Sequence, residues 1–362
     1  MSGFDDYLNS LSESEIAEYS RVSDNFHAAC EMEEDGPKQE AALEAVYRDA
    51  KALNSAMIMA GARWWQVVSL LQRGEFAEGF RLFVPAMEFV TERANEIPET
   101  MREPMETLVL MPLVAMTDDP NVPRATIEAY LDHLEVEVKA GRGGARANLA
   151  LARAAWHAHT GERSRFDGWF DQWVTGGPGW WDPQKSTTVL LTSALLSAFD
   201  PADALEYLDR REATMVGSEA SRRTVTINRA GWTTLCGQPE KAWQQYRQTL
   251  KDTDRSEFDD IVSDVDEFAV ICASEAAPWD SADDDTVSKA RFLLDAVEKA
   301  TESKVDAIEA AAALARHYRL RNDPATGQRW QSIAYERARL FDARNETDHW
   351  TTTLTTHWFQ EG

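Results

Sequence analysis

The chain has few cysteines, and their spacing excludes a disulfide framework or a zinc knuckle. Cys30, Cys236 and Cys272 are three in number and far apart, and no CxxC pair occurs. Each cysteine lies among apolar or small residues, which is typical of a small buried hydrophobe. We therefore expect a protein of a reducing compartment that holds no metal.

Basic side chains are also scarce. The 362 residues include 37 Lys and Arg against 62 Asp and Glu, which gives a net charge of −25. Nucleic acids and anionic membranes attract basic surfaces, so neither is expected as a partner. The most acidic stretch, residues 254–285, is instead suited to contact a basic partner. We expect an acidic outer surface and a less acidic groove.

Long hydrophobic runs are missing as well. The N-terminus is acidic and has neither the basic nor the apolar region of a secretory signal. The longest weakly charged stretch, residues 186–199, is too short to span a bilayer. Hydrophobic residues still make up 43% of the chain, which excludes disorder of the whole. These features predict a soluble, cytoplasmic protein.

Period-2 segments typical of strands do not follow one another anywhere in the sequence, whereas helix formers dominate long stretches. In residues 306–320, for example, Ile308, Ala311, Ala315 and Tyr318 recur at helical intervals. The pattern predicts an all-α fold.

Glycine and proline gather in short turn signals between the helical stretches. These signals lie near positions 36, 74, 119, 161, 200, 237, 280 and 322, about 41 residues apart. Gly suits the end of one helix and Pro the start of the next. We therefore predict a single repeat domain, 1–362, of about eight antiparallel helix pairs with a C-terminal capping helix. The predicted units are roughly 1–53, 54–97, 98–140, 141–178, 179–215, 216–253, 254–303 and 304–345, with a cap at 346–362 whose amphipathic part is Asp348 to Phe359.

Residues 228–250 resemble one repeat of the tetratricopeptide family. In NRAGWTTLCGQPEKAWQQYRQTL, Ala230 is the small packing residue and Gly237 the turn, and Ala242 and Tyr246 form the Ala-x3-aromatic pair. More degenerate copies surround Gly74, Gly161 and Gly327. The family repeat is about 34 residues long, and a period near 41 is also typical of HEAT repeats, so a HEAT-like solenoid stays open.

The resemblance implies an α-solenoid superhelix whose first helices line a concave groove that binds a protein or peptide. Family positions place the following residues on the groove: Trp64, Trp65, Asn148, His159, Thr224, Asn228, Arg316 and Arg319. Asn228 falls where clamp-type members keep an Asn that binds the ligand backbone, although the companion lysines are not found. The Gly- and Pro-flanked pair Trp180 and Trp181 is a second candidate contact.

Catalytic motifs are nearly absent. The sequence contains no HExxH, Walker A, GxGxxG or GxSxG pattern. Residues 259–267 resemble the second metal-binding motif of class I terpene synthases, which would put Asp260, Ser263 and Glu267 around Mg²⁺. The first aspartate-rich motif of that family is not matched.

We therefore predict a non-catalytic scaffold or adaptor that needs no cofactor. The alternatives are a ligand-responsive regulator of the same fold and, behind it, a Mg²⁺-dependent enzyme similar to class I terpene synthases.

Overall fold

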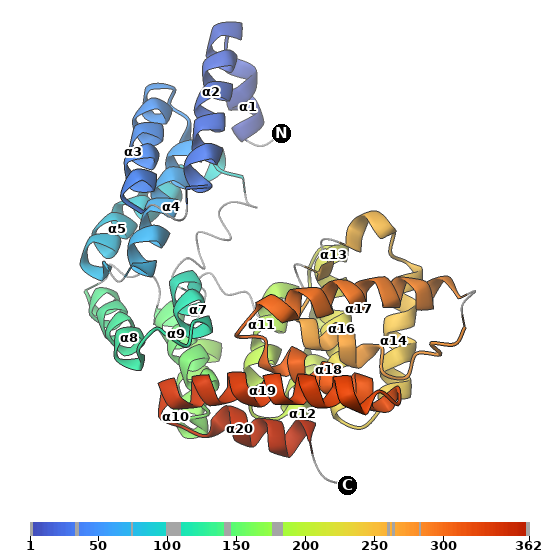
Figure 1. Ribbon diagram of the computed structural model, residues 1–362. Coiled ribbons are helices and arrows are strands. Elements are labelled where there is room, and N and C mark those ends of the chain that lie inside the picture. The colour runs from blue at the N-terminus through green and yellow to red at the C-terminus, as the bar shows by residue number, and fades with distance from the viewer. Residues whose placement is uncertain are drawn as a thin grey trace. The chain divides into compact units, whose positions relative to one another are not determined.

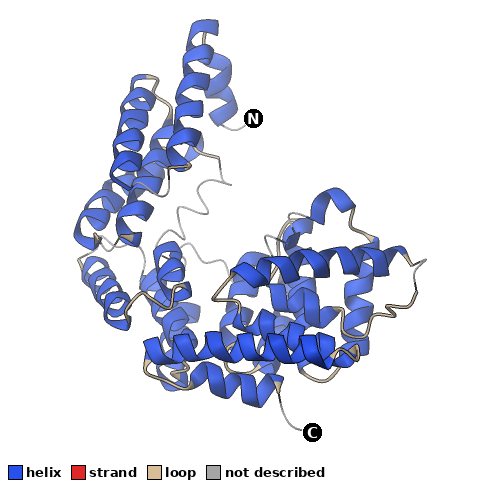
Figure 2. Ribbon diagram, in the orientation of Figure 1, coloured by secondary structure: helices blue, strands red, loops and turns tan. Residues whose placement is uncertain are grey.

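The computed structural model describes residues 3–32, 36–73, 75–98, 110–140, 146–175, 184–258, 261–262, 265–281 and 284–359. Within these ranges the chain forms eighteen α-helices and no strand (Figures 1 and 2). An isolated bridge joins Lys185 and Val216. The prediction of an all-α fold is confirmed. No helix in these ranges combines the length and the apolar character needed to cross a membrane.

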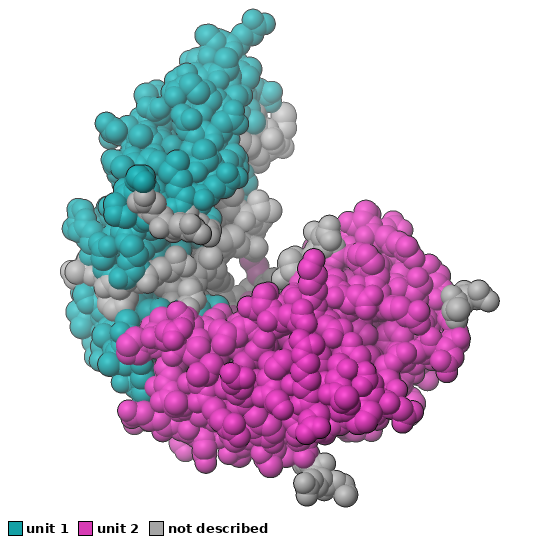
Figure 3. Space-filling view, in the orientation of Figure 1, with its two compact units in different colours: residues 1–117, 124–153, 175–180 teal, residues 118–123, 154–174, 181–362 magenta. Residues whose placement is uncertain are grey.

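The chain divides into two compact units, which are coloured separately in Figure 3. The first unit consists of Met1–Thr117, Arg124–Arg153 and Thr175–Trp180, and the second of Asp118–Pro123, Ala154–Val174 and Trp181–Gly362. A repeat array can itself contain such segments. The single solenoid of about eight pairs therefore stays a prediction.

The first unit is a set of helices packed in sequence order. Its helices are α1 (Gly3–Ser10), α2 (Glu13–Cys30), α3 (Gly36–Ala52), α4 (Ala56–Gln72), α5 (Phe76–Glu92), the 3-10 turn η1 (Ala94–Glu96), most of α7 (Leu110–Asp118) and α8 (Arg124–Lys139). Contacts join α2 to α3, α3 to α4, α4 to α5 and α5 to α8. A capping box begins α2, since Ser12 Oγ accepts from Glu15 N at 3.4 Å and Glu15 Oε2 accepts from Ser12 N at 2.8 Å.

The second unit carries the longer helical array. Its elements are α10 (Arg163–Thr175), α11 (Ser186–Ser197), α12 (Pro201–Arg211), η2 (Glu212–Thr214), α13 (Glu219–Leu235), α14 (Pro239–Lys251), η3 (Arg255–Glu257), α16 (Glu267–Ala273), α17 (Asp285–Ser303), α18 (Ile308–Leu320), α19 (Pro324–Asn345), α20 (His349–Thr353) and the π-helical turn η4 (Leu354–Trp358). Helix α9 (Arg146–His159) has residues in both units. Contacting neighbours α11 and α12, α13 and α14, and α18 and α19 fall within the predicted units 179–215, 216–253 and 304–345.

The predicted turn signals explain where these helices end. Gly161 follows α9 with φ 71°, Gly237 follows α13 with φ 79°, and Asn322 follows α18 with φ 60°. This left-handed conformation favours glycine and asparagine, and it stops a helix. Pro239 and Pro324 then occupy the first positions of α14 and α19, where a missing N–H costs nothing.

Successive first helices lie side by side: α11 contacts α13, α13 contacts α16, and α16 contacts α18. The approach of α13 to α16 depends on Gly231, because a Cβ there would lie 2.6 Å from Cα of Ala269. Thr234 Oγ1 donates to the carbonyl of Cys272 at 2.9 Å, 38 residues away, which is close to the predicted repeat length. Gly231 therefore sets the helix spacing at a place where the sequence pointed to Ala230.

Aromatic side chains fill the core between the helices of the second unit. Trp173, Trp232, Trp330 and Tyr246 are each at most 1% exposed. Ala242 is also fully buried, so both members of the Ala-x3-aromatic pair pack inside. At the C-terminus, α20 packs on α19 and η4 on α18, within the stretch predicted as a cap.

Candidate functional site

Two of the predicted groove residues, Thr224 and Asn228, lie one turn apart on α13. Asn228 is completely buried, and its Nδ2 donates to the carbonyl oxygen of Thr224 at 3.1 Å. Its Oδ1 is buried without a hydrogen-bond partner among the described atoms. Thr224 is half-buried and borders a hollow of the surface. A partner on this face would thus reach Thr224 before Asn228.

The predicted residue His159 lies in an aromatic cluster near the C-terminus. Arg344 Nη2 approaches His159 Nε2 to 2.7 Å, and the histidine ring stacks on Trp156 and meets Phe341 and Trp350 edge-on. Because Arg can only donate, Nε2 of His159 accepts, which makes the ring neutral with its proton on Nδ1. Burial and the Arg344 charge lower the pKa of His159 to about 3. Here His159 is a packing residue.

Arg316 and Arg319 are on α18, but each has a partner within the protein. The guanidinium of Arg316 binds both carboxylate oxygens of Glu275, at 2.7 and 3.0 Å. Arg319 is exposed, hydrogen bonds to Gln331 and lies 5.3 Å from the ring centroid of Phe359. Of the two, Arg319 is the more accessible to a partner.

The remaining predicted residues are in other places. Trp64 and Trp65 on α4 meet edge to face with ring centroids 5.1 Å apart, and they pack against different apolar clusters. Asn148 belongs to α9, and its side chain lies outside the described part of the structure. Trp180 and Trp181 also lie outside the described residues. Of the predicted residues that the structure describes in the second unit, Thr224 and Asn228 belong to α13, His159 packs against Phe341 and Trp350, and Arg316 and Arg319 belong to α18, so these five do not form one cluster.

A hollow of about 450 Å³ opens over α11 and α13. We call it the apolar hollow, because Leu190, Leu191 and Ala194 of α11 and Ala220 of α13 form much of its wall. Thr224 also borders it. It is large enough to hold one or two apolar side chains of a bound chain.

A second hollow of about 190 Å³ continues from the first, since both are lined by Ala194 and Asp266. Asp266, Glu267, Asp306 and Glu309 line it, and no basic residue is among its described lining residues. We call it the acidic hollow, and the two together the groove. The groove thus spans α11, α13, the start of α16 and the start of α18. At this end the groove is acidic, unlike the less acidic groove that the sequence led us to expect, and that expectation stays a prediction.

The carboxylates of the acidic hollow differ in their partners. Lys304 forms an ion pair with Glu267. Asp266 and Glu309 have no ion pair or side-chain hydrogen bond within the described part of the structure. Desolvation by the surrounding protein raises the pKa of Glu309 to about 7, with Asp266 contributing. Desolvation likewise raises the pKa of Asp266, with help from Glu267, although its side chain still reaches solvent.

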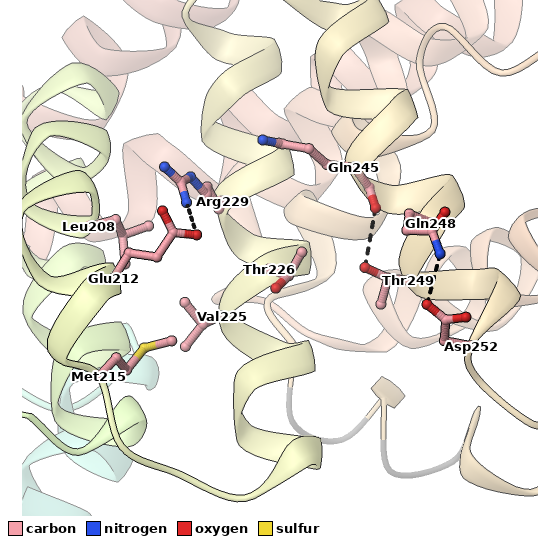
Figure 4. Close-up of a pocket in the computed structure, with 10 residues that line it drawn as sticks. All are labelled: Leu208, Glu212, Met215, Val225, Thr226, Arg229, Gln245, Gln248, Thr249 and Asp252. Carbon is pink, nitrogen blue, oxygen red and sulfur yellow. Dashed lines mark hydrogen bonds and ion pairs between the residues drawn. The ribbon is translucent and has the colours of Figure 1, made fainter.

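Another cavity, of about 380 Å³, lies between α12, η2, α13 and α14 (Figure 4). We call it the α12–α14 cavity. Leu208, Met215 and Val225 form its apolar wall. Arg229, one turn after Val225 on α13, lies beside Glu212 and binds it at 2.8 Å. Nothing in the sequence pattern pointed to this cavity.

The sequence indicated only part of the acidic hollow. Asp266 and Glu267 fell inside the acidic stretch 254–285, so charge density had marked them. Glu309 lies off the apolar stripe of residues 306–320, and no pattern in the sequence singles it out.

Among the described residues, no three His, Cys, Asp or Glu side chains gather so as to hold a metal ion. Asp260 and Ser263 of the terpene-synthase-like pattern lie outside those residues. No protein family, curated protein or solved structure matches this chain.

Proposed function

We propose that this protein is a non-catalytic scaffold or adaptor with a tetratricopeptide-like α-solenoid fold, and that its groove binds an extended segment of a protein partner. The observation that carries the proposal is the continuity of the apolar and acidic hollows over α11, α13, α16 and α18. These are the first helices of successive predicted pairs, which line the ligand groove in solenoids of this kind.

The chemistry of the groove favours a basic segment. Asp266 and Glu309 are unpaired carboxylates at one end, and Leu190 and Leu191 form an apolar wall at the other. A Lys or Arg side chain would neutralise the carboxylates, and an adjacent apolar side chain would be removed from water in the apolar hollow. We therefore propose a partner segment that carries basic residues next to apolar ones.

Peptide titration tests this function. The probe is a labelled peptide of Leu-Lys pairs separated by Gly and Ser, and the comparison peptide carries Glu in place of Lys. We expect binding of the Lys peptide only, with an affinity that falls as salt rises, because charge attraction between exposed groups is screened. Equal binding of both peptides, or of neither, would contradict the proposal.

A matched pair of variants locates the contact. Glu309→Gln removes a carboxylate of the acidic hollow, and Glu336→Gln makes the same change at an exposed position of α19 that lines neither hollow. We expect Glu309→Gln to weaken binding of the Lys peptide by about 5- to 10-fold and Glu336→Gln to leave it unchanged. Equal losses in the two variants would mean that only net charge matters.

A further inference from the structure

We propose that the α12–α14 cavity is a binding site for a small protonated amine with an apolar body. The inference goes beyond the groove, because the cavity is lined by other residues and would take a small molecule. Its volume of about 380 Å³ lies in the range of small-molecule sites.

One polar atom at this cavity has no partner. Gln245 lines it, and Gln245 Oε1 is buried with no hydrogen bond among the described atoms. A buried acceptor without a donor is costly, so a ligand that supplies an N–H there gains affinity. An ammonium group offers three such donors.

The other polar groups of the wall are already engaged. Thr226 Oγ1 donates to the carbonyl of Arg222 at 2.9 Å, and Thr249 Oγ1 donates to the backbone carbonyl of Gln245 at 3.2 Å. Gln248 Nε2 donates to Asp252 Oδ2 at 2.9 Å (Figure 4). The wall therefore offers one unused amide acceptor, Gln245 Oε1, beside the carboxylates of Glu212 and Asp252, and otherwise apolar contact.

The charges around the cavity decide the sign of the ligand. Arg229 is held between Glu212 and Asp209, and Asp252 adds another carboxylate. Among the residues that line the cavity, one positive charge, Arg229, thus faces two carboxylates, Glu212 and Asp252. An anion would be repelled, whereas a cation gains from the excess negative charge. The body of the ligand would lie against Leu208, Met215 and Val225.

Helix α13 connects this cavity with the groove. Val225, Thr226 and Arg229 line the cavity, whereas Ala220, Ser221 and Thr224 line the apolar hollow. At 100° per residue the centres of these two sets are about 140° apart around the helix. The cavity also lies between α12 of predicted unit 179–215 and α13 and α14 of unit 216–253. A molecule bound there would therefore fix the distance between the two helix pairs. Any effect on groove binding rests on the proposed function.

The test compares three probes with one body: phenylbutylamine, phenylbutanol and phenylbutyrate. Calorimetry on the full chain should give the tightest binding for the amine and at least about 10-fold weaker binding for the carboxylate. Absence of amine binding, or binding of the carboxylate as tight as that of the amine, would overturn the proposal. This result is independent of peptide binding, so the failure of either proposal can be told apart.

Two matched variants place the ligand. Gln245→Leu removes the unpaired acceptor, and Gln244→Leu makes the same change at the exposed neighbouring residue. We expect Gln245→Leu to weaken amine binding at least about 5-fold and Gln244→Leu to leave it unchanged. Equal effects of the two substitutions would contradict the assignment. Thr226→Phe fills the cavity and should abolish binding while circular dichroism and the melting temperature show an intact fold. Undiminished amine binding by folded Thr226→Phe would also overturn the site.

Discussion

The C-terminal cluster around Asp342 and the acidic hollow around Glu309 both surround carboxylates with protein, but they differ in the hydrogen-bond donors that they supply. Asp342 Oδ1 accepts from Trp350 N at 2.9 Å, and Asp342 Oδ2 accepts from Thr351 N at 2.9 Å and from Thr351 Oγ1 at 2.6 Å. Glu309 has no such partner within the described residues, and its pKa is raised to about 7. A carboxylate whose hydrogen bonds are all made contributes to the stability of the fold, whereas a carboxylate that is shielded from water and has no partner is a candidate binding group.

The largest effect on stability should come from removing the hydrogen-bond acceptor of the C-terminal cluster. Asp342→Ala leaves three donors of Trp350 and Thr351 without their acceptor in a site where Asp342 is 6% exposed. We expect the free energy of unfolding to fall by about 2–4 kcal/mol. Urea unfolding measures it, and Glu336→Ala on the exposed side of α19 should change it by less than about 0.5 kcal/mol. Equal losses in the two variants would contradict this role of Asp342.

The reverse effect is expected in the acidic hollow. Because the folded state raises the pKa of Glu309 from 4.5 to about 7, folded protein binds more protons than unfolded protein in that window. The free energy of unfolding therefore decreases as pH rises through it. Glu309→Gln should raise that free energy by about 1–3 kcal/mol near pH 8 and by much less near pH 4.5. Lower stability of the variant near pH 8 would mean that the carboxylate has a stabilising partner.

His159 provides a titration of opposite sign. Its pKa is lowered to about 3, so below the usual value of 6.5 the unfolded chain takes up a proton that the folded chain refuses. Its contribution to stability is present above pH 6.5 and is lost as pH falls. His159→Gln should flatten the loss of stability on acidification from about pH 6.5 to 4 by about 1–3 kcal/mol, as urea unfolding at several pH values would show. An unchanged slope would indicate that water reaches the ring.

The smallest effect is expected at Arg319, which was a predicted groove residue. Its side chain is exposed, and its contacts with Gln331 and Phe359 are at the surface. Arg319→Ala should change the free energy of unfolding by less than about 0.5 kcal/mol. If the free energy of unfolding fell by more than about 1 kcal/mol in thermal or urea unfolding, the contacts of Arg319 would stabilise the fold as those of Asp342 do.

The helices and their ends were predictable because they depend on local chemistry. Gly161, Gly237 and Asn322 adopt the left-handed conformation that ends a helix, and Pro239 and Pro324 occupy first positions of the helices that follow. The need for Gly231 was less visible, because the close approach to Ala269 is a contact between helices 38 residues apart in the chain.

The site was harder to predict, because the groove positions came from the repeat pattern of the tetratricopeptide family. Those positions selected Asn228, which is fully buried, and His159, which packs among aromatic rings, and they missed Glu309 in the first turn of α18. A side chain's exposure depends on the neighbouring helices, which a single repeat does not contain. Charge density did mark Asp266, since an excess of acidic residues in one segment is visible without knowledge of the packing.

The most direct measurement is the affinity of the Lys peptide between about pH 5 and 8. If the peptide binds at Asp266 and Glu309, affinity should rise about 3- to 10-fold with pH as these carboxylates ionise while Lys stays charged. The double variant Asp266→Asn, Glu309→Gln should bind weakly at every pH. An affinity that does not change with pH, or one that the double variant retains, would contradict the proposal that the groove binds a basic segment.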